Sequence, residues 1–383
     1  MVESRKKDAK VRETKYELLR LLAMLMIMAS HSVKCTMGTE YEFLGEPPGL
    51  NYFAALATVL VGNIGTYLFI LLSCWFSTEK IGFRTDRILR LLWQVWTTCL
   101  LCAGFGAAFR LRSFTMRTLL REMVTPFGPQ NGTQYWYVTA FAAFLLLLPA
   151  LQYLAQKLDD KKIGFLCVVL IALGPLRQFI DTDLLGDVGD FVLMFFLCVY
   201  MKHKPDNWLR RHCFLGLALL ALLVAGTLLA RVVLPERLAG FTIVGTSGGR
   251  FNVMILRLRK RTIFQMFGAL CLFYAFDRLR IRPVAAINRL AGYAFGVYLW
   301  HYNVMFREVI WQDVFHSEQL FRGGSPVYVL IPLLAPLAVY LAASAVEFVR
   351  RRVLDQWLYP KLPWNASLCA KLDSIYDWSK QQV

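Results

Sequence analysis

Long apolar runs recur along the whole chain and limit its fold more than any other feature of the sequence. Ten of them cover residues 17–34, 52–76, 88–109, 135–155, 163–180, 187–201, 213–234, 262–277, 288–310 and 326–349. A helix of about 17–25 apolar residues crosses the hydrocarbon layer of a bilayer, whereas the strands of a membrane barrel alternate apolar and polar residues. The sequence therefore predicts an all-α, polytopic transmembrane bundle of about ten spans.

The charges between these runs predict how the bundle sits in the membrane. With the basic N-terminal segment in the cytoplasm, five further basic segments fall on the same side: Lys80/Arg84/Arg87/Arg90, Lys157/Lys161/Lys162, Lys202/Lys204/Arg210/Arg211, Arg278/Arg280/Arg282/Arg289 and Arg350/Arg351/Arg352. Three opposite loops are acidic or mixed: Glu40/Glu42/Glu46, Asp181/Asp183/Asp187 and Glu308/Asp313/Glu318. Because short cytoplasmic loops are enriched in Lys and Arg, we expect a multi-pass protein of the cell membrane with both termini cytoplasmic.

The Lys and Arg residues of the cytoplasmic loops also explain the net charge of +17. We therefore expect membrane lipids and no nucleic acid as partners. Two loops on the predicted outer side, 110–134 and 231–261, are nevertheless basic. Local anchoring to anionic lipid headgroups is the simpler interpretation. The functional alternative is an electropositive rim for an anionic acceptor.

Three segments divide the chain: a basic cytoplasmic tail (1–16), a membrane domain (17–350) and a cytoplasmic interfacial tail (351–383). The last segment is rich in Trp and Tyr, which concentrate at membrane–water interfaces. Cys99 and Cys102 have C-x-x-C spacing, but inside an apolar run they are better explained as small packing residues. We expect no metal site.

The first run contains two ionisable side chains, Arg20 and His31. Eleven helical positions turn about 20° beyond three full turns and rise about 16 Å, so both side chains lie on one face. Arg20 alone is explained by an anchor at the cytoplasmic helix end. An ionisable residue well inside a span, such as His31, marks a functional site by default. A neutral imidazole accepts a proton, which makes His31 a candidate general base.

The order of short motifs along the chain resembles the acyltransferase-3 family of membrane acyltransferases. Arg20-x10-His31 is similar to the signature of the family's first helix, and "LFILLSCWFS" (68–77) to the end of its second. "DRILRLL" (86–92) resembles the basic motif that follows, "QYWYVTAFAAFLLLLP" (134–149) the Trp-Tyr-Leu helix, and "GVYLWHYNV" (296–304) the late Tyr-Leu-x-His helix. Cys74 stands where the family usually has glycine, and the usual proline is missing after Leu92.

The resemblance implies transfer of an acyl group, usually acetyl, from cytoplasmic acyl-CoA to a hydroxyl of a cell-surface glycan or its lipid-linked precursor. Acyl-CoA is then a donor substrate, and no bound cofactor is expected. Arg20, Arg87 and Arg90 lie on the predicted cytoplasmic side, where guanidinium groups suit the donor's phosphates. His31 takes the proton of the acceptor hydroxyl. The acceptor sugar, the acyl group and the oligomeric state are not predicted.

Five further residues are candidates for substrate contacts. Ser73 either contacts substrate or hydrogen-bonds its own helix backbone. Trp136 and Tyr137 are typical of an outer aromatic belt, and the resemblance makes them acceptor contacts. His301 lies inside a span, three residues after Tyr298 and on the same helix face.

Two alternatives stay open at the level of sequence. His31 either acts directly as a base or carries the acyl group covalently between two half-reactions. A transporter of a glycan or glycolipid, with Arg20 and His31 lining its pathway, is the alternative function. Transporters often contain internal repeats, and none is visible in this sequence.

Overall fold

The computed structural model describes residues 13–35, 49–78, 84–111, 115–117, 120, 135–176, 184–233, 242–244, 250–252, 261–362 and 367–375. Its longer helices are α1 (Thr14–Lys34), α2 (Leu50–Trp75), α3 (Thr85–Ala108), α5 (Trp136–Lys157), α8 (Gly186–His203), α10 (Cys213–Val233) and α16 (Ile331–Arg350). The shorter ones are α6 (Asp160–Leu173), α9 (Trp208–Arg211), α12 (Ile263–Asp277), α13 (Ala285–Ala291), α14 (Ala294–His301), α15 (Ser317–Arg322) and α17 (Ser367–Ile375). Two π-helices, η3 (Val309–Val314) and η5 (Arg351–Leu358), two 3₁₀-helices, η4 (Pro326–Leu330) and η6 (Tyr359–Lys361), and an antiparallel pair of strands, β1 (Thr242–Val244) and β2 (Arg250–Asn252), complete the described elements. The predicted all-α class is confirmed apart from this one small hairpin.

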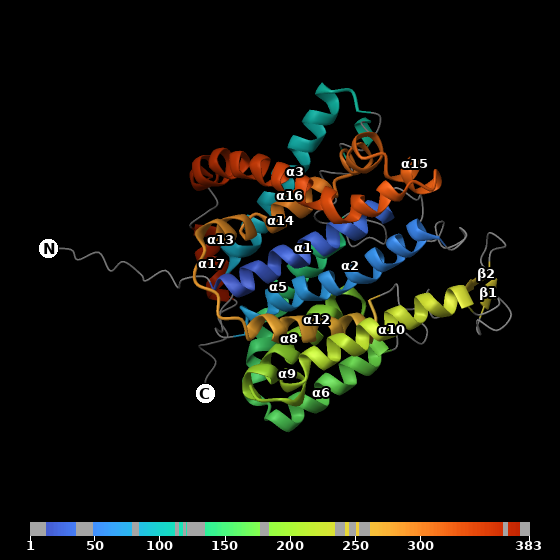
Figure 1. The fold of residues 1–383 in the computed structure, drawn as a ribbon. Coiled ribbons are helices and arrows are strands. Elements are labelled where there is room, and N and C mark those ends of the chain that lie inside the picture. The colour runs from blue at the N-terminus through green and yellow to red at the C-terminus, as the bar shows by residue number, and fades with distance from the viewer. Residues whose placement is uncertain are drawn as a thin grey trace.

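The central pair of the bundle is α1 and α2, which lie side by side along most of their length (Figure 1). On one side of this pair lie α3, α14 and α16, and on the other lie α6, α8, α10 and α12. Two glycines of α2 permit the close approach: a Cβ on Gly65 would lie 2.7 Å from the carbonyl oxygen of Ala23, and one on Gly62 would meet Ser30. Small residues commonly allow membrane helices to pack this closely.

Five described helices are long and apolar enough to cross a membrane: α1, α2, α3, α5 and the continuous helix Pro326–Lys361. Two shorter apolar helices, Cys213–Gly226 and Ile263–Asp277, add to them. These helices overlap predicted apolar runs, which supports a multi-pass membrane protein. The count of ten spans and the orientation of the termini stay predictions. The acidic loops at 40–46 and 181–183, and most of the basic loops 110–134 and 231–261, lie outside the described residues.

The run 288–310 differs from expectation, because α13, α14 and η3 divide what was predicted to be one span. Beyond the end of α14, the side chain of Asn303 accepts a hydrogen bond of 2.9 Å from the backbone N–H of Met305. An Asn side chain that bonds the backbone two residues further on stabilises a turn in competition with a helix. The break leaves His301 at the C-terminal end of a short helix.

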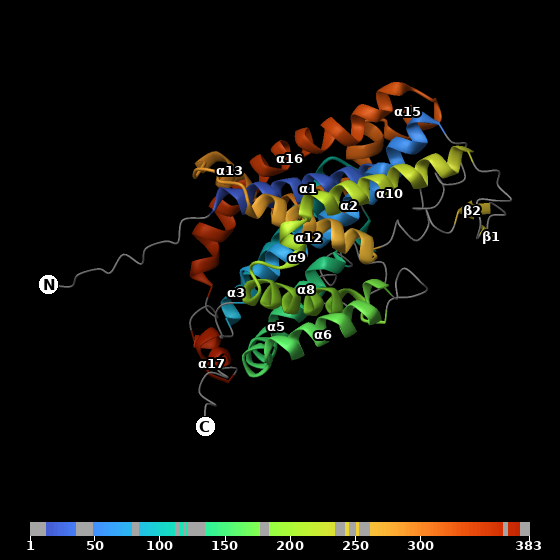
Figure 2. The same cartoon turned by 60° about the horizontal axis from the view of Figure 1, so that its bottom comes forward.

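The segment after α16 folds against the rest of the protein. η5 follows α16 without interruption, and α17 packs on the start of α3. There Asp373 accepts hydrogen bonds from the backbone N–H (2.7 Å) and the hydroxyl (2.6 Å) of Thr85. A carboxylate at a helix N-terminus satisfies an otherwise unpaired N–H and complements the helix dipole. Figure 2 shows that the start of α1, α13 and α17 gather at one end of the bundle.

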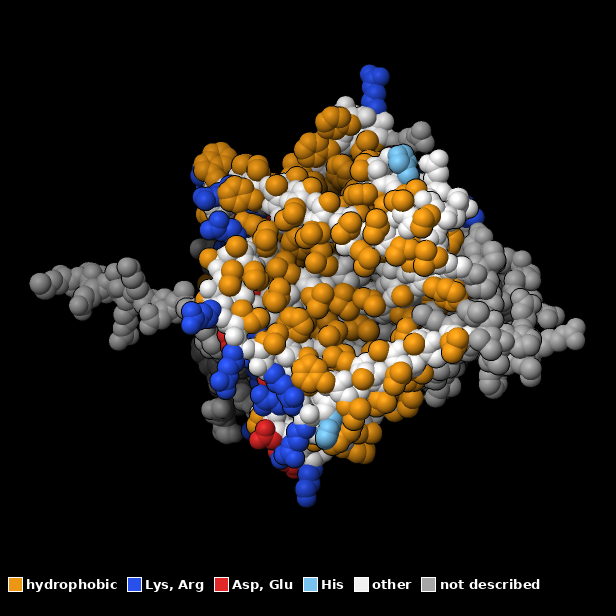
Figure 3. Space-filling model, viewed as in Figure 1, with side chains coloured by type: hydrophobic (Ala, Val, Ile, Leu, Met, Phe, Trp, Pro, Cys, Tyr) orange, Lys and Arg blue, Asp and Glu red, His pale blue; other side chains and the backbone are white. Residues whose placement is uncertain are grey.

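Basic side chains mark that end, which we call the basic end. In Figure 3, Lys and Arg side chains lie along it, while apolar side chains cover most of the rest of the visible face. Exposed leucines on α10 and α16 belong to this apolar surface: Leu219, Leu222, Leu333, Leu334, Leu337 and Leu341. Apolar patches of this extent are rare on proteins surrounded by water and are expected where helices face lipid.

Replacing Gly65 with alanine tests the close contact between α1 and α2. The new Cβ would crowd a backbone oxygen of α1, so we expect the free energy of unfolding to fall by about 1–3 kcal/mol. The matched control is Gly104→Ala in α3, where no contacting heavy atom lies within 4 Å of the Cβ position and alanine favours the helix. Thermal unfolding in detergent measures both variants. Equal melting temperatures would contradict the tight contact.

Candidate functional site

A cavity of about 480 Å³ opens at the basic end of the bundle. Elements from both ends of the described chain build it, and its lining residues are Arg20, Phe69, Leu72, Ser73, Phe76, Arg87, Arg90, Leu91, Trp93, Gln94, Tyr137, Phe141, Ala291, Gly292, Phe295, Arg351, Asp355, Gln356 and Tyr359. We call it the arginine cavity. Five residues singled out from the sequence meet here: Arg20, Ser73, Arg87, Arg90 and Tyr137. A concave site with four arginines suits a ligand that carries several negative charges.

Carboxylates one helical turn away hold two of these arginines. Arg20 Nη1 lies 2.5 Å from an oxygen of Glu17, which is almost fully buried. Arg90 Nε lies 2.9 and 2.8 Å from the two oxygens of Asp86. A guanidinium carries five N–H donors, so both arginines are oriented by their partners and still keep donors for a ligand.

Arg87 differs from its neighbours, because among the described residues it has no carboxylate partner. Its guanidinium lies 5.7 Å from the ring centroid of Phe141, and its Nη2 is 3.5 Å from the hydroxyl of Ser77. A guanidinium in a cavity with no carboxylate beside it is well suited to an anionic ligand. Among the four arginines of the cavity, Arg87 is therefore the one whose charge no described carboxylate balances.

Ser73 and Tyr137 join two helices at the cavity wall. The Ser73 hydroxyl donates to the carbonyl of Phe69 (2.9 Å), so it bonds its own helix backbone, which was one of its two predicted roles. It also lies 3.0 Å from the hydroxyl of Tyr137. Since a serine hydroxyl has one proton to donate, Tyr137 must be the donor of the second bond. The oxygen of Tyr137 then keeps its own acceptor capacity.

His31 and His301 meet outside the lining of the arginine cavity. His31 Nδ1 lies 2.9 Å from His301 Nε2, and the two rings are stacked with centroids 5.2 Å apart. The ring of Tyr302 stacks on His31 at 4.0 Å. His301 is fully buried, whereas His31 is half-buried. The two histidines chosen from the sequence therefore form one hydrogen-bonded pair.

The hydrogen bonds of the pair determine which nitrogen is free. His301 Nδ1 lies 2.7 Å from the carbonyl oxygen of Val297, and because a carbonyl only accepts, this nitrogen carries a proton. For neutral rings, Nε2 of His301 is then an acceptor and Nδ1 of His31 the donor. The remaining nitrogen of His31, Nε2, carries a lone pair. The geometry orients His31 as a proton acceptor.

Aromatic rings connect the histidine pair to the arginine cavity. The rings of Tyr137 and Tyr298 have centroids 6.0 Å apart, and those of Tyr298 and His301 are 6.2 Å apart. Tyr298 is buried and lies between the two places. Arg20 and His31 share a helix face, as predicted, but the structure places them at the two ends of this aromatic connection.

Trp136 does not line the arginine cavity, although its ring centroid lies 5.9 Å from that of Tyr137, which does. It stands where α5, α8 and α12 begin. The guanidinium of Arg261 lies 4.3 Å from its ring centroid and pairs with Asp187 and, at 2.6 Å, with Asp190. Burial disfavours the charged form of Arg261, but Asp190 and Asp187 outweigh it and raise the pKa of this group, so it stays cationic. The structure thus gives Trp136 a cationic partner from the protein itself.

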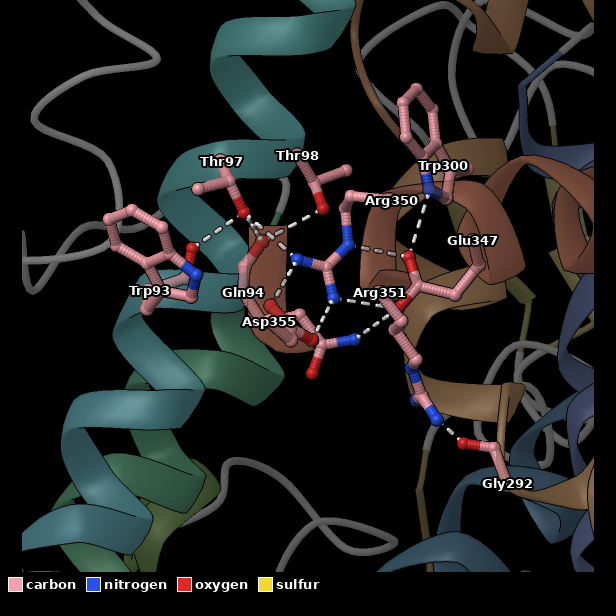
Figure 4. Close-up of polar contacts among 10 residues, drawn as sticks. All are labelled: Trp93, Gln94, Thr97, Thr98, Gly292, Trp300, Glu347, Arg350, Arg351 and Asp355. Carbon is pink, nitrogen blue, oxygen red and sulfur yellow. Dashed lines mark hydrogen bonds and ion pairs between the residues drawn. The ribbon is translucent and has the colours of Figure 1, made fainter. Parts of the chain in front are cut away.

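A buried ion-pair network beside the cavity was missed in the sequence (Figure 4). Glu347, fully buried in α16, accepts hydrogen bonds from Gln94, Trp300, Arg350 and Arg351. A signal was present, because Glu347 lies in the predicted span 326–349 and an ionisable residue inside a span marks a site by default. The criterion that selected His31 would also have selected Glu347.

Replacing Arg87 with glutamine tests whether the cavity binds anions. A ligand that binds only the folded protein raises its melting temperature, and we expect inorganic pyrophosphate to do so for the unaltered protein. Loss of one charge-assisted contact should raise the pyrophosphate concentration needed by about tenfold or more. Arg289→Gln, exposed on α13 and outside the cavity lining, is the control and should respond normally. Equal responses of all three proteins would exclude anion binding at Arg87.

Comparison with known proteins identifies one family. The sequence matches the acyltransferase-3 family, described as an acyltransferase domain, over residues 14–346, which is 333 of 383 residues. The match includes both histidines of the pair and ends before the cavity residues of η5 and η6. No curated protein and no solved structure matches the chain.

Proposed function

The chain belongs to the acyltransferase-3 family and is a multi-pass membrane acyltransferase, and we propose that it is an O-acetyltransferase of the cell membrane. Its donor is cytoplasmic acetyl-CoA, and its acceptor is a hydroxyl of a cell-surface glycan or of a lipid-linked precursor. The hydrogen bond between His31 and His301 carries this proposal. This hydrogen bond orients an imidazole as a proton acceptor in a protein of the acyltransferase-3 family.

The arginine cavity is the proposed site for the phosphates of the donor. Coenzyme A carries its negative charges at one end of a flexible arm, and the arginines of the cavity lie together at the basic end. Arg87 supplies a guanidinium with no carboxylate partner among the described residues, and Arg20 and Arg90 supply guanidinium groups oriented by their own carboxylates. Guanidinium groups match phosphate oxygens in both charge and geometry.

The arm of the donor is proposed to extend along α1 from Arg20 towards His31. Three successive turns of helix separate these residues, a rise of about 16 Å. Ser73, Tyr137 and Tyr298 lie along this direction and are proposed contacts for the donor or the acceptor. Trp136, at the start of α5, remains a proposed contact for the acceptor glycan.

Transfer then needs one proton acceptor and one leaving group. Nε2 of His31 takes the proton of the acceptor hydroxyl as that oxygen attacks the thioester carbonyl carbon. The new C–O bond forms, the C–S bond breaks, and the proton passes from His31 to the departing thiolate. During this step the His31 ring is an imidazolium whose Nδ1–H still donates to His301. His301 thereby positions the base and stabilises its charged form.

Replacing His31 with alanine tests the proposed base. We expect the rate of acyl transfer to fall by about 10²–10⁴-fold, the usual contribution of a general base. The measurement is transfer of radiolabel from acetyl-CoA to envelope glycan by purified protein in vesicles. His203→Ala, an exposed histidine paired with Asp160, is the matched control. An unchanged rate in His31→Ala would exclude this mechanism, and no transfer by the unaltered protein would exclude the proposed substrates.

Two replacements of His301 separate its positioning role from simple packing. Glutamine offers a carbonyl oxygen that can accept the Nδ1–H of His31, whereas leucine of similar size cannot. We expect His301→Gln to retain more activity than His301→Leu, with the difference in kcat rather than in KM for the donor. Equal activities of the two variants would contradict the hydrogen-bonded pair.

A further inference from the structure

The segment 351–359 lies beyond the region that matches the family, yet it forms one wall of the arginine cavity. Its contributions are Arg351, Asp355, Gln356 and Tyr359. The sequence alone suggested an interfacial tail, with its arginines as determinants of orientation. The structure places the beginning of this segment in the wall of the proposed donor site.

The buried carboxylate of Glu347 determines the position of this wall of the cavity. Glu347, one residue beyond the family match, has no exposed surface and accepts hydrogen bonds from Arg350 and Arg351. Its carboxylate also accepts from Gln94 of α3 (2.9 Å) and Trp300 of α14 (3.2 Å). Removing a partner from a buried charge is strongly unfavourable, so the carboxylate holds the start of η5 against α3 and α14. These contacts are seen in Figure 4.

The π-helical winding of η5 adds a second constraint. Arg350 donates through both terminal nitrogens to Asp355, at 2.8 and 2.7 Å. The two residues are five apart, which is the hydrogen-bonding period of a π-helix. Such a two-bond pair has a defined geometry, so it fixes Asp355 in the cavity wall. π-Helical turns are rare and often occur at functional sites.

Arg351 is the basic group that this arrangement presents to the cavity. Its Nε donates to Glu347 (2.9 Å), its Nη2 donates to the carbonyl of Gly292 (2.7 Å), and its guanidinium lies 4.9 Å from the ring centroid of Tyr293. These bonds use two of the five N–H donors. The side chain is 29% exposed, so the oriented guanidinium remains accessible to a ligand.

The same segment also supports an arginine of α3. The ring of Tyr359 lies 4.6 Å from the guanidinium of Arg90, and its hydroxyl donates to Asp86, the carboxylate that holds Arg90, at 3.4 Å. Tyr359 is fully buried. The wall therefore contributes one arginine and orients another.

We propose that Arg351 binds a phosphate of the acyl donor and that Glu347 is the positioning residue that holds it in place. This inference rests on the proposed function, because it takes the donor to be a phosphate-bearing thioester. It extends the donor site beyond the matched region into η5. The cavity then has four guanidinium groups for the donor's phosphates, three of them oriented by carboxylates.

The experiment compares binding of coenzyme A with binding of pantetheine, which has the same arm but no nucleotide and no phosphate. Calorimetry on the full-length protein in nanodiscs gives both dissociation constants, and their ratio isolates the part of binding due to the nucleotide and phosphates. We expect Arg351→Met to lower the preference for coenzyme A by about ten- to a hundredfold and to leave pantetheine binding unchanged. Arg351→Lys keeps the positive charge but lacks the planar pair of guanidinium donors, so its preference for coenzyme A should lie between those of the unaltered protein and Arg351→Met.

Arg352→Met is the matched control. Arg352 is the next residue, is exposed, and lies over the ring of Phe348 outside the cavity lining. Its replacement should leave the preference unchanged. Glu347→Gln should lower the preference for coenzyme A over pantetheine and raise KM for acetyl-CoA, because it loosens Arg351. A fall in kcat is expected as well, because Glu347 also accepts a hydrogen bond from Trp300, the neighbour of His301.

The outcomes separate this inference from the proposed function. An unchanged preference for coenzyme A in folded Arg351→Met, or an equal loss for both ligands, overturns the role of Arg351. If Arg351→Met does not fold, Arg351→Lys decides in the same way. An unaltered protein that prefers coenzyme A, loses this preference in Arg351→Met, and transfers no acyl group would support the phosphate site while overturning the proposed reaction.

Discussion

The arrangement of this bundle depends on one carboxylate that has no exposed surface, that of Glu347. A buried carboxylate costs several kcal/mol unless it is paired and hydrogen-bonded, and here the partners come from α3, α14, α16 and η5. Gly296 of α14 has no side chain, and a Cβ there would collide with this carboxylate. The elements that converge on Glu347 bring cavity arginines from α3 and η5 together with the helix that carries His301. A single electrostatic requirement thus aligns both functional places.

The arginine cavity follows a consistent pattern in which carboxylates orient guanidinium groups. Glu17 holds Arg20, Asp86 holds Arg90, and Glu347 holds Arg351. A side chain that is already oriented loses less conformational entropy when a ligand binds, and the acidic partner offsets repulsion between neighbouring cations while the cavity is empty of anions. Arg87 lacks such a partner among the described residues, so it supplies the excess positive charge that attracts an anion.

The sequence predicted the long helices because apolar runs are local features, and the loop charges and the family resemblance singled out five of the residues that line the cavity. Apolar runs marked the long helices, and the spacing of Arg20 and His31 placed them on one face of α1. The sequence did not predict the division of the run 288–310, because it depends on the side-chain turn at Asn303. Nor did it predict the wall formed by η5, because that wall depends on partners of Glu347 far away in the chain. Pairings of this kind have no local signature.

The histidine pair shows how local and distant constraints combine in one proton acceptor. The tautomer of His301 is determined within α14, because Val297, four residues earlier, offers the carbonyl that takes its Nδ1 proton. The lone pair on Nε2 of His301 is therefore independent of the position of α1. The orientation of His31, in contrast, depends on the position of α1 relative to α14, which follows from the contact of α1 with the glycines of α2 and from the attachment of α14 to Glu347. A shift of either contact would leave the tautomer of His301 intact but would move His31 Nδ1 away from its acceptor. The basicity and the direction of His31 Nε2 therefore depend on the packing of the whole bundle and not on α1 alone.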